Sequence, residues 1–217
     1  FLEAEYQDRA AEMCRIFGID GLVIIGGDGS FRGAQKLSQR GISVVGVPGT
    51  IDLDIACSEY TIGFDTATNI AVEAVARLRD TSTSHERCSV VEVMGRNCGE
   101  LALWTGISTG ADAIMIPEDA ESQSFDHLIR VIMENRARGK KHNIIIVAEG
   151  VGHAEELAQR IHEVTGIESR TTILGHVQRG GRPTALDIKH ASMMGYLAVE
   201  ALYRGETNRI IGVQKGQ

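Results

Sequence analysis

Short, nearly uninterrupted apolar runs constrain the fold of this chain more than any other feature. The runs that have the length of a strand are 22–25 (LVII), 42–47 (ISVVGV), 88–94 (CSVVEVM), 113–116 (AIMI) and 143–147 (NIIIV). Continuous hydrophobicity, rather than alternation, is typical of strands covered on both faces of a parallel sheet. Segments with apolar residues three and four positions apart, typical of amphipathic helices, separate these runs. The alternation predicts an α/β fold with parallel sheets and right-handed crossovers.

The helical segments follow from the same periodicity. We expect helices at 1–18, 30–40, 69–79, 100–108, 124–138, 155–164 and about 185–203, and further short strands at 171–174 and 210–213. Ser124 is a suitable N-cap residue. Two of the expected helices carry clear apolar stripes. The stripe of the helix at 1–18 consists of Leu2, Tyr6, Ala10, Met13, Cys14 and Phe17, and that of the helix at 124–138 of Phe125, Leu128, Ile129, Ile132 and Met133. Trp104, in the helix at 100–108, is expected to serve in packing.

Composition excludes several classes of protein. A chain of 217 residues that is 43% hydrophobic can bury a proper core. Its net charge of −7 argues against nucleic acid as a partner. No run of 18 or more apolar residues and no signal sequence is present, so we expect a cytoplasmic protein without a membrane partner. The widely spaced Cys14, Cys57, Cys88 and Cys98 are expected to be reduced thiols that form neither disulfides nor a zinc site.

The first suggestive loop, Gly26 to Ser30 (GGDGS), follows a predicted strand and precedes a predicted helix. Ligands of parallel sheets bind at the carboxyl ends of the strands. The sequence is neither a Walker A motif nor a G-x-G-x-x-G fingerprint. Its glycines nevertheless let backbone N–H groups approach phosphate at a helix N-terminus, and Asp28 can hold Mg²⁺. The alternative is simply a tight turn.

The second loop places Asp52 and Asp54 two residues apart after Pro48-Gly49-Thr50. One carboxylate could be ordered by a metal while the other takes a proton from an attacking hydroxyl group. The alternative is a polar turn in which an aspartate caps a helix.

Basic residues stand in later glycine-rich loops or at strand ends. His176, Arg179 and Arg182 share one loop that suits a phosphate monoester, and Arg87, Arg96 and Arg170 could also hold an anion. The alternative for each arginine is a solvated surface charge.

Taken together, the motifs GGDGS, PGTID-x-D, YTIGFDTA, RDTSTSHERCSVVEVMGRNCG, RGKKHNIIIVAEGV and ILGHVQRGGRPT resemble the bacterial-type ATP-dependent 6-phosphofructokinases. The resemblance runs from about residue 15 to the end. It implies transfer of the γ-phosphoryl group of Mg-ATP to the 1-hydroxyl of fructose 6-phosphate, a step of glycolysis, in a homotetramer. It also implies two Rossmann-like three-layer domains with mainly parallel sheets: an ATP-binding domain at 1–62, a substrate-binding domain at 63–177, and a segment, 178–217, returning to the first.

The resemblance also implies roles for individual residues. Asp52 resembles the catalytic base, flanked by Thr50, which touches the substrate, and Asp54, which helps to order metal and phosphates; Arg96 is grouped with them as catalytic. Asp28 resembles the metal ligand. The residues expected to bind ATP are Gly27, Asp28, Gly29, Ser30 and Gly33. The residues expected to bind the sugar phosphate are Thr50, Ile51, Asp52, Arg87, Met94, Gly95, Arg96, Glu149, Arg170, His176, Val177, Gln178 and Arg179. The residues expected to bind an effector such as ADP or phosphoenolpyruvate are Arg79, Gly110, Ala111, Asp112, Arg138, Lys140, Lys141 and His142.

Arg87 and Arg170 resemble a pair that reaches into a neighbouring subunit's substrate site. Gly29 and Gly49 resemble the ATP-using branch, since pyrophosphate-using relatives have Asp and Lys there. Two departures stand out: Leu53 replaces the Asn of the family motif, and the chain lacks the family's N-terminal glycine-rich strand-loop, an ATP-binding arginine and the C-terminal segment. The sequence therefore predicts a central fragment.

Two alternatives stay open at this stage. The chain could be a catalytically incompetent piece that binds sugar phosphate or assembles with partners. It could also be a related α/β lipid or nucleoside kinase that shares GGDG, although MGR and GHVQRGG argue against that reading.

Overall fold

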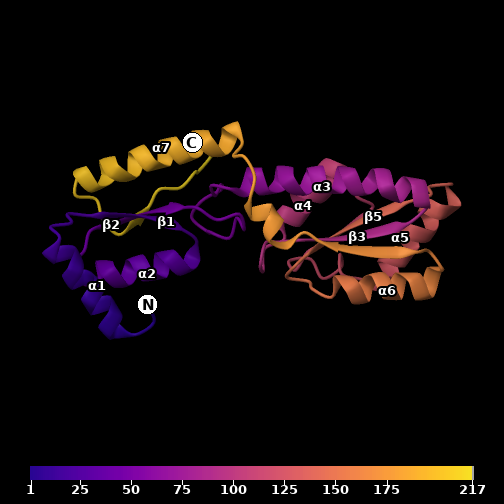
Figure 1. The fold of residues 1–217 in the computed structure, drawn as a ribbon, viewed down its shortest axis with the longest axis horizontal. Coiled ribbons are helices and arrows are strands. Elements are labelled where there is room, and N and C mark those ends of the chain that lie inside the picture. The colour runs from indigo at the N-terminus through magenta and orange to yellow at the C-terminus, as the bar shows by residue number, and fades with distance from the viewer. Residues whose placement is uncertain (217) are drawn as a thin grey trace. The chain divides into compact units, whose positions relative to one another are not determined.

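The computed structural model describes residues 1–216, which form two compact units (Figure 1). Unit 1 comprises Phe1–Thr50, Asp54–Gly63 and the residues from Pro183 onward. Unit 2 comprises Ile51–Leu53 and Phe64–Arg182. Each unit has its own sheet and its own core, and each is described separately below.

Unit 1 is a three-stranded parallel sheet with helices on both faces (Figure 1). Its elements are α1 (Ala4–Ile16), β1 (Leu22–Gly26), α2 (Asp28–Ser38), β2 (Val44–Pro48), α7 (Ala185–Tyr203) and β7 (Arg209–Ile210), with strand order β1-β2-β7. Every residue of β2 is buried. Val44 packs with residues of α1 and α2, whereas its neighbour Val45 packs with residues of α7. The two-sided burial predicted from the apolar runs is thus confirmed for β2.

Unit 2 is a four-stranded parallel sheet of order β4-β5-β3-β6. Its elements are α3 (Phe64–His85), β3 (Cys88–Val93), α4 (Glu100–Thr109), β4 (Ala113–Met115), α5 (Phe125–Ala137), β5 (Asn143–Ala148), α6 (Ala154–Thr165), β6 (Ser169–Ile173) and the 3₁₀ turn η1 (Gly175–Arg179). Val91 and Val93 face α3 and α4, while Cys88 and Val90 face α5 and α6. The α/β class with parallel sheets, predicted from the sequence, is confirmed.

Helix α3 is much longer than the predicted 69–79: it begins earlier, at Phe64, and its polar end continues the helix to His85 instead of closing it. Four consecutive hydroxyl side chains donate hydrogen bonds to the carbonyl four residues earlier: Thr81, Ser82, Thr83 and Ser84. Serine and threonine can satisfy their hydroxyl groups in this way within a helix. The expected break at Asp80 is therefore wrong.

Several apolar side chains do not lie where periodicity placed them. In α1 the buried residues are Gln7, Ala11 and Cys14, whereas Leu2, Tyr6, Met13 and Phe17 are exposed. Met133 in α5 is exposed as well, although Leu128 and Ile132 are buried and Ser124 caps the helix by accepting a hydrogen bond from His127 N. Trp104 is 52% exposed and makes a T-shaped ring contact with Phe64, and Cys57 is exposed.

Two other predicted segments differ in kind or length. The loop expected at 175–182 begins as the 3₁₀ turn η1, and the strand expected at 210–213 is reduced to the two residues of β7. Within residues 1–216 no helix is both long and apolar enough to cross a membrane.

Candidate functional site

The glycine turn of unit 1 joins the end of β1 to the start of α2. Gly27 is the N-cap of α2, and its carbonyl accepts hydrogen bonds from Ser30 N and Phe31 N at 3.0 and 3.1 Å. Gly49 N donates to Gly26 O at 3.0 Å, which ties the loop after β2 to the same turn. A Cβ at Gly26 would lie only 2.3 Å from Ser30 Oγ, so the turn requires glycine there. The structure thus brings two glycine loops together at the carboxyl ends of β1 and β2.

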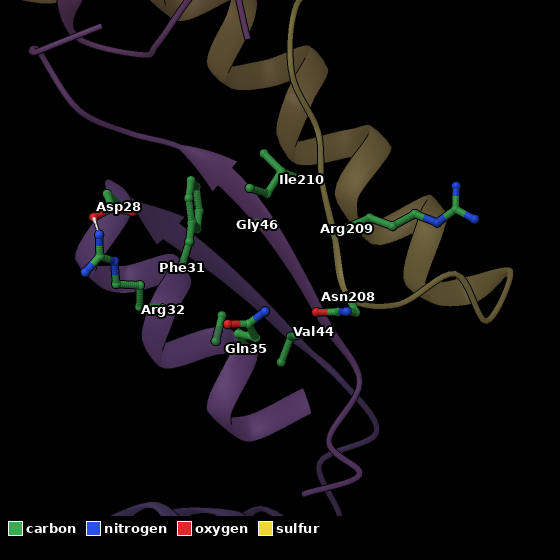
Figure 2. A pocket seen from close by; sticks show the side chains of 10 residues that line it. Asp28, Phe31, Arg32, Gln35, Val44, Gly46, Asn208, Arg209 and Ile210 are labelled. Atoms are coloured by element: carbon green, nitrogen blue, oxygen red, sulfur yellow. Dashed lines mark ion pairs between the residues drawn. The ribbon is translucent and has the colours of Figure 1, made fainter. Parts of the chain in front are cut away.

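Asp28 lies in the first turn of α2, where the helix dipole favours negative charge. Its Oδ2 is 2.9 Å from Arg32 Nη2, and its side chain is 49% exposed. Figure 2 shows both residues at a pocket of about 330 Å³ that is also lined by Gly46 of β2 and by Arg209 and Ile210 of β7. A Cβ at Gly29 would meet no atom within 4 Å, so the space beside the turn is open. An exposed carboxylate beside open space can take part in metal binding.

The segment carrying Asp52 divides between the units. Thr50 and Asp54 belong to unit 1, whereas 51–53 belong to unit 2. Asp52 is 4% exposed, and Ile51 is buried with Phe64, Ala67, Met94 and Leu101. Leu53 has φ of 54°, in the left-handed region that residues other than glycine and asparagine rarely adopt. Asp52 is therefore held by a buried residue before it and a strained residue after it.

The second group of expected site residues gathers at the carboxyl ends of β3 and β5 in unit 2. Glu149 Oε1 accepts hydrogen bonds from the backbone N–H groups of Gly95 and Arg96. Gln178, which is 1% exposed, accepts a hydrogen bond from Met94 N at 2.8 Å through Oε1. Glu149 and Gln178 therefore brace the Met94–Arg96 backbone from two other loops.

Close packing explains the glycines of this edge. A Cβ at Gly95, whose φ is +141°, would lie 2.4 Å from Cys98 O, and a Cβ at Gly150 would lie 2.4 Å from Arg96 O. Arg96 itself has φ of 54°. The tightly folded loop thus fixes the position of the Arg96 backbone.

His176 and Arg179 lie three residues apart in η1, and both are exposed. A 3₁₀ helix has three residues per turn, so side chains at this spacing lie on one face. Gln178 points inward instead, and Val177 is 63% exposed. The short 3₁₀ turn, which the sequence did not predict, thus presents an imidazole and a guanidinium side by side.

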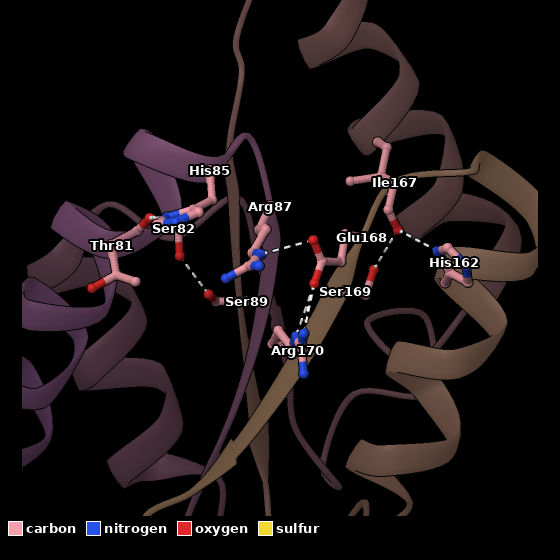
Figure 3. A network of polar contacts seen from close by, with 10 residues as sticks. All are labelled: Thr81, Ser82, His85, Arg87, Ser89, His162, Ile167, Glu168, Ser169 and Arg170. Carbon is pink, nitrogen blue, oxygen red and sulfur yellow. Dashed lines mark hydrogen bonds and ion pairs between the residues drawn. The ribbon is translucent and has the colours of Figure 1, made fainter.

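Arg87 and Arg170 lie at the opposite end of the same sheet. They mark the amino ends of the neighbouring strands β3 and β6 (Figure 3). Arg87 directly precedes β3 and Met94 directly follows it, so seven steps of about 3.3 Å separate the two residues by about 23 Å. A single small molecule cannot reach both ends within one chain. The structure therefore separates this pair from Arg96 and Glu149.

The expected effector residues gather at this amino end of unit 2. Arg79 donates to the carbonyl oxygens of Thr109 and Gly110, where α4 ends with Gly110 in a left-handed conformation. Asp112 Oδ1 accepts a hydrogen bond from Lys140 Nζ at 2.6 Å. Arg79 bonds to the C-terminal end of α4, Asp112 directly precedes β4, and Lys140 lies shortly before β5, so all three residues lie at the amino edge of the sheet.

Charges within this group are partly neutralised. Asp112 also accepts hydrogen bonds from Asn135 Nδ2 and Ile144 N, at 2.7 and 2.9 Å, so its carboxylate braces the chain. Lys141 pairs with Glu86 at 2.7 Å and Arg138 with Glu134 at 3.7 Å. Burial first, and then the positive charges of Lys140 and Arg79, lower the pKa of His142. The group is therefore a basic cluster in which the buried carboxylate of Asp112 already accepts hydrogen bonds from within the protein.

Sequence reasoning missed the functional candidates whose partners are distant. Glu168 contacts both Arg87 and Arg170. Asp187, 2% exposed, accepts hydrogen bonds from Tyr60 OH and Gly63 N at 2.5 and 2.6 Å, and so ties the start of α7 to the end of the 54–63 segment. Glu168 directly precedes β6, and neither it nor Arg170 falls within the strand expected at 171–174, so the sequence carried no signal for this contact.

Comparison with known proteins agrees with this arrangement. The family model described as Phosphofructokinase matches residues 1–202. A curated relative named ATP-dependent 6-phosphofructokinase, from Clostridium acetobutylicum, is 57% identical over 217 residues, which cover 100% of this chain and 67% of the relative. A relative of the same name from Clostridium botulinum is 56% identical with the same coverage. The chain thus spans about two thirds of the length of the curated relatives it matches.

Solved structures give the same picture. The phosphofructokinase of Saccharomyces cerevisiae is 32% identical with a TM-score of 0.90, covering 99% of this chain and 33% of that one. That of Pichia pastoris in the T-state is 36% identical with a TM-score of 0.91, covering 99% and 26%. A pyrophosphate-dependent phosphofructokinase from Marinobacter aquaeolei, 24% identical with a TM-score of 0.84 over 99% of this chain and 60% of that one, bears on the fold alone. With the family model matched over residues 1–202, the chain belongs to the phosphofructokinase family.

Proposed function

We propose that this protein transfers the γ-phosphoryl group of ATP to the 1-hydroxyl group of fructose 6-phosphate, as a cytoplasmic step of glycolysis. The observation that carries the proposal is the 57% identity, across the whole chain, with a relative named for this activity. Two loop systems of the kind this reaction needs support it: a glycine turn at a helix N-terminus, and an arginine-bearing, braced loop at a sheet edge.

The ATP phosphates are assigned to the turn Gly27–Ser30, with Gly33 one turn further along α2. The N-terminus of α2 favours negative charge, and exposed N–H groups in such turns bind phosphate. The open space at Gly29 leaves room for a nucleotide beyond the transferred phosphoryl group, which favours ATP over pyrophosphate as the donor.

Asp28 is the proposed metal residue. Mg²⁺ commonly uses one or two carboxylates together with substrate phosphates, and within residues 1–216 no cluster of three or more acidic, histidine or cysteine ligands offers another metal site. The exposed carboxylate of Asp28 at a helix N-terminus fits this role, although it must be shared with Arg32. Magnesium bound there would neutralise charge that develops on the phosphates.

Asp52 is the proposed general base, which accepts the proton of the sugar 1-hydroxyl group. The neighbouring Thr50 and Asp54 are assigned to contact substrate and to order the phosphates, and Ile51 to shape the pocket. Because Asp52 is 4% exposed and follows a buried residue, its carboxylate is held in a defined place, which proton transfer requires.

The sugar phosphate is assigned to the carboxyl edge of unit 2. Arg96, His176 and Arg179 supply positive charge, while the braced backbone of Met94 and Gly95 shapes the site. Glu149, Val177 and Gln178 complete the set. The roughly 23 Å between this edge and Arg87 implies that Arg87 and Arg170 serve another copy of the chain. A homotetramer with shared substrate sites accounts for both groups.

The basic cluster at the amino edge of unit 2 is the proposed effector site. Arg79, Lys140 and His142 present positive charge there, together with Arg138 and Lys141 and the turn Gly110–Asp112. An anionic regulator such as ADP or phosphoenolpyruvate suits this charge. The neutralising contacts of Asp112 limit how many cations remain for a ligand.

The proposal is tested first by assaying ATP-dependent formation of fructose 1,6-bisphosphate. Asp52→Asn should lower kcat by roughly 10²-fold to 10⁴-fold while KM changes little, because the carboxylate acts on a proton in flight. Asp20→Asn, the same change at an exposed position outside the proposed site, should leave kcat unchanged. A raised KM with unchanged kcat for Asp52→Asn would refute its role, and a wild-type chain that binds sugar phosphate without turnover would favour the binding-only alternative.

Shared sites are tested by mixing subunits. Arg87→Ser should raise KM for fructose 6-phosphate. Assemblies that combine Asp52→Asn chains with Arg87→Ser chains should recover part of the activity, since an intact Asp52 then meets an intact Arg87 from another copy. Absence of recovery in verified mixed assemblies would contradict a shared site.

A further inference from the structure

Glu168 joins the two arginines at the amino end of the unit 2 sheet. Arg170 donates hydrogen bonds from Nε and Nη2 to Glu168 Oε1, at 3.0 and 2.8 Å. Arg87 Nε lies 2.9 Å from the other oxygen, Oε2. Figure 3 shows the carboxylate between the two guanidinium groups. Each oxygen of one carboxylate thus engages one arginine.

The two arginines need an anion between them. They extend from neighbouring strands, with Ser89 paired to Arg170 in the ladder and Arg87 two residues before Ser89. Paired strands lie about 4.8 Å apart, so the two positive charges repel each other unless a negative charge separates them. Arg87 and then Arg170 lower the pKa of Glu168, which keeps this carboxylate ionised. In the free protein Glu168 therefore supplies the counter-charge.

The contact is not what holds the strands together. The backbone ladder between β3 and β6 runs from Cys88 to Glu92, and Cys88 N donates to Glu168 O at 2.9 Å. The side chains of Glu168 and Arg170 are 47% and 67% exposed. Ion pairs at such exposed positions contribute little to stability. The side chain of Glu168 can leave without disrupting the sheet.

Glu168 engages Arg87 less completely than it engages Arg170. The carboxylate accepts two well-aligned hydrogen bonds from Arg170, whereas its contact with Arg87, 2.9 Å between Oε2 and Nε, is an ion pair whose geometry is poorer for a hydrogen bond. A phosphate group offers three acceptor oxygens and can bond both guanidinium groups at once with better geometry.

We propose that Glu168 is an internal competitor for the anion site formed by Arg87 and Arg170. In the free protein its carboxylate occupies both arginines, and a phosphate monoester binds only by displacing it. This inference rests on the proposed function, in which the two arginines bind the sugar phosphate. Glu168 then lowers the affinity of the pair for phosphate and keeps it from binding weaker anions.

The test compares the wild type with Glu168→Gln, which keeps the size of the side chain and removes its charge. Dissociation constants for inorganic phosphate and fructose 6-phosphate are measured by calorimetry. Because exposed ion pairs are weak, we expect Glu168→Gln to bind both ligands roughly 3-fold to 10-fold more tightly. The matched control is Glu73→Gln, which removes the carboxylate paired with Arg77 on α3 and should leave both constants unchanged.

Further readouts separate competition from a structural role. The side-chain Nε–H resonances of Arg87 and Arg170 should shift on addition of phosphate at lower concentration in Glu168→Gln than in the wild type, and Glu168→Asp should behave like the wild type or between the two. Equal or weaker binding by Glu168→Gln, with an unchanged thermal midpoint, would overturn the proposal. Absence of phosphate binding in every variant would overturn it too. If the wild type binds the ligands without phosphoryl transfer, the proposed reaction fails while the dissociation constants still decide the role of Glu168.

Discussion

Leu53 offers a direct measure of backbone strain beside Asp52. Its φ of 54° lies in the left-handed region, which costs an ordinary residue about 1–2 kcal/mol and which asparagine tolerates best after glycine. Its side chain is partly buried against the cluster of Ile51, Phe64, Ala67, Met94 and Leu101. Full burial of a leucine contributes about 1.5–3 kcal/mol, so about 1 kcal/mol is a reasonable value for half-burial. Strain and packing are thus of similar size and opposite sign.

Two substitutions separate these contributions. Leu53→Ala removes the packing but keeps the strain, and should lower the free energy of unfolding by about 1 kcal/mol. Leu53→Asn removes the same packing and relieves the strain, so it should be about 1 kcal/mol more stable than Leu53→Ala. Urea unfolding with a common m-value measures both. Equal stability of the two variants would refute the claim that the backbone is strained at this position.

Two further predictions concern the donor and the pH dependence of stability. The double change Gly29→Asp with Gly49→Lys should lower ATP-dependent kcat/KM far more than it lowers the binding of fructose 6-phosphate. A carboxylate in the open space at Gly29 repels the nucleotide phosphates. A side chain at Gly49 must displace Ile25, whose Cγ2 lies 2.9 Å from the added Cβ. Gly29→Ala controls for size, assays with ATP and pyrophosphate measure the outcome, and undiminished ATP use would contradict it. Burial, and secondarily a nearby negative charge, raises the pKa of the Cys88 thiol from 9.0 to about 12. As the pH rises, the unfolded chain loses the thiol proton before the folded chain does. This contribution to the free energy of unfolding is therefore full below pH 9 and declines between pH 9 and 12, by at most about 1.4 kcal/mol per pH unit. Urea unfolding over this range should show a shallower decline for Cys88→Ala than for the wild type, and equal slopes of stability against pH would contradict the raised pKa of Cys88.

Two of the expected buried strands were predictable because their signal is local, whereas β1 is only partly buried and Ile25 in it is 68% exposed. The run 143–147 became β5, every residue of which is buried, and the run 42–47 contains β2. The position of the loops that follow such strands was predictable for the same reason, since parallel strands bring their carboxyl ends to one edge. The glycine turn at Gly26 and the braced loop at Gly95 lie at such edges, while their role as ligand sites stays a prediction.

What the sequence could not predict depends on distant partners. The periodicity of the first helix correctly pointed to Cys14, but it also pointed to Leu2, Tyr6 and Phe17, which are exposed, and it missed the buried Gln7. Glu168 is important only because Arg87, far earlier in the chain, lies beside it. Glu149 was expected to contact a sugar hydroxyl group, a role that stays a prediction, while its bonds to backbone N–H groups became visible only in three dimensions.

The order of the chain also gives the two units different histories during synthesis. Unit 2 is complete once Arg182 has been added, whereas unit 1 still lacks α7 and β7. Val45 and Val47 have no cover on one face until Met194 and Ala198 emerge. Since domains fold as units while the ribosome is still adding residues, unit 2 can fold first, and the nascent chain carries an open apolar sheet face until α7 leaves the exit tunnel. Transiently exposed apolar surface of this kind favours aggregation.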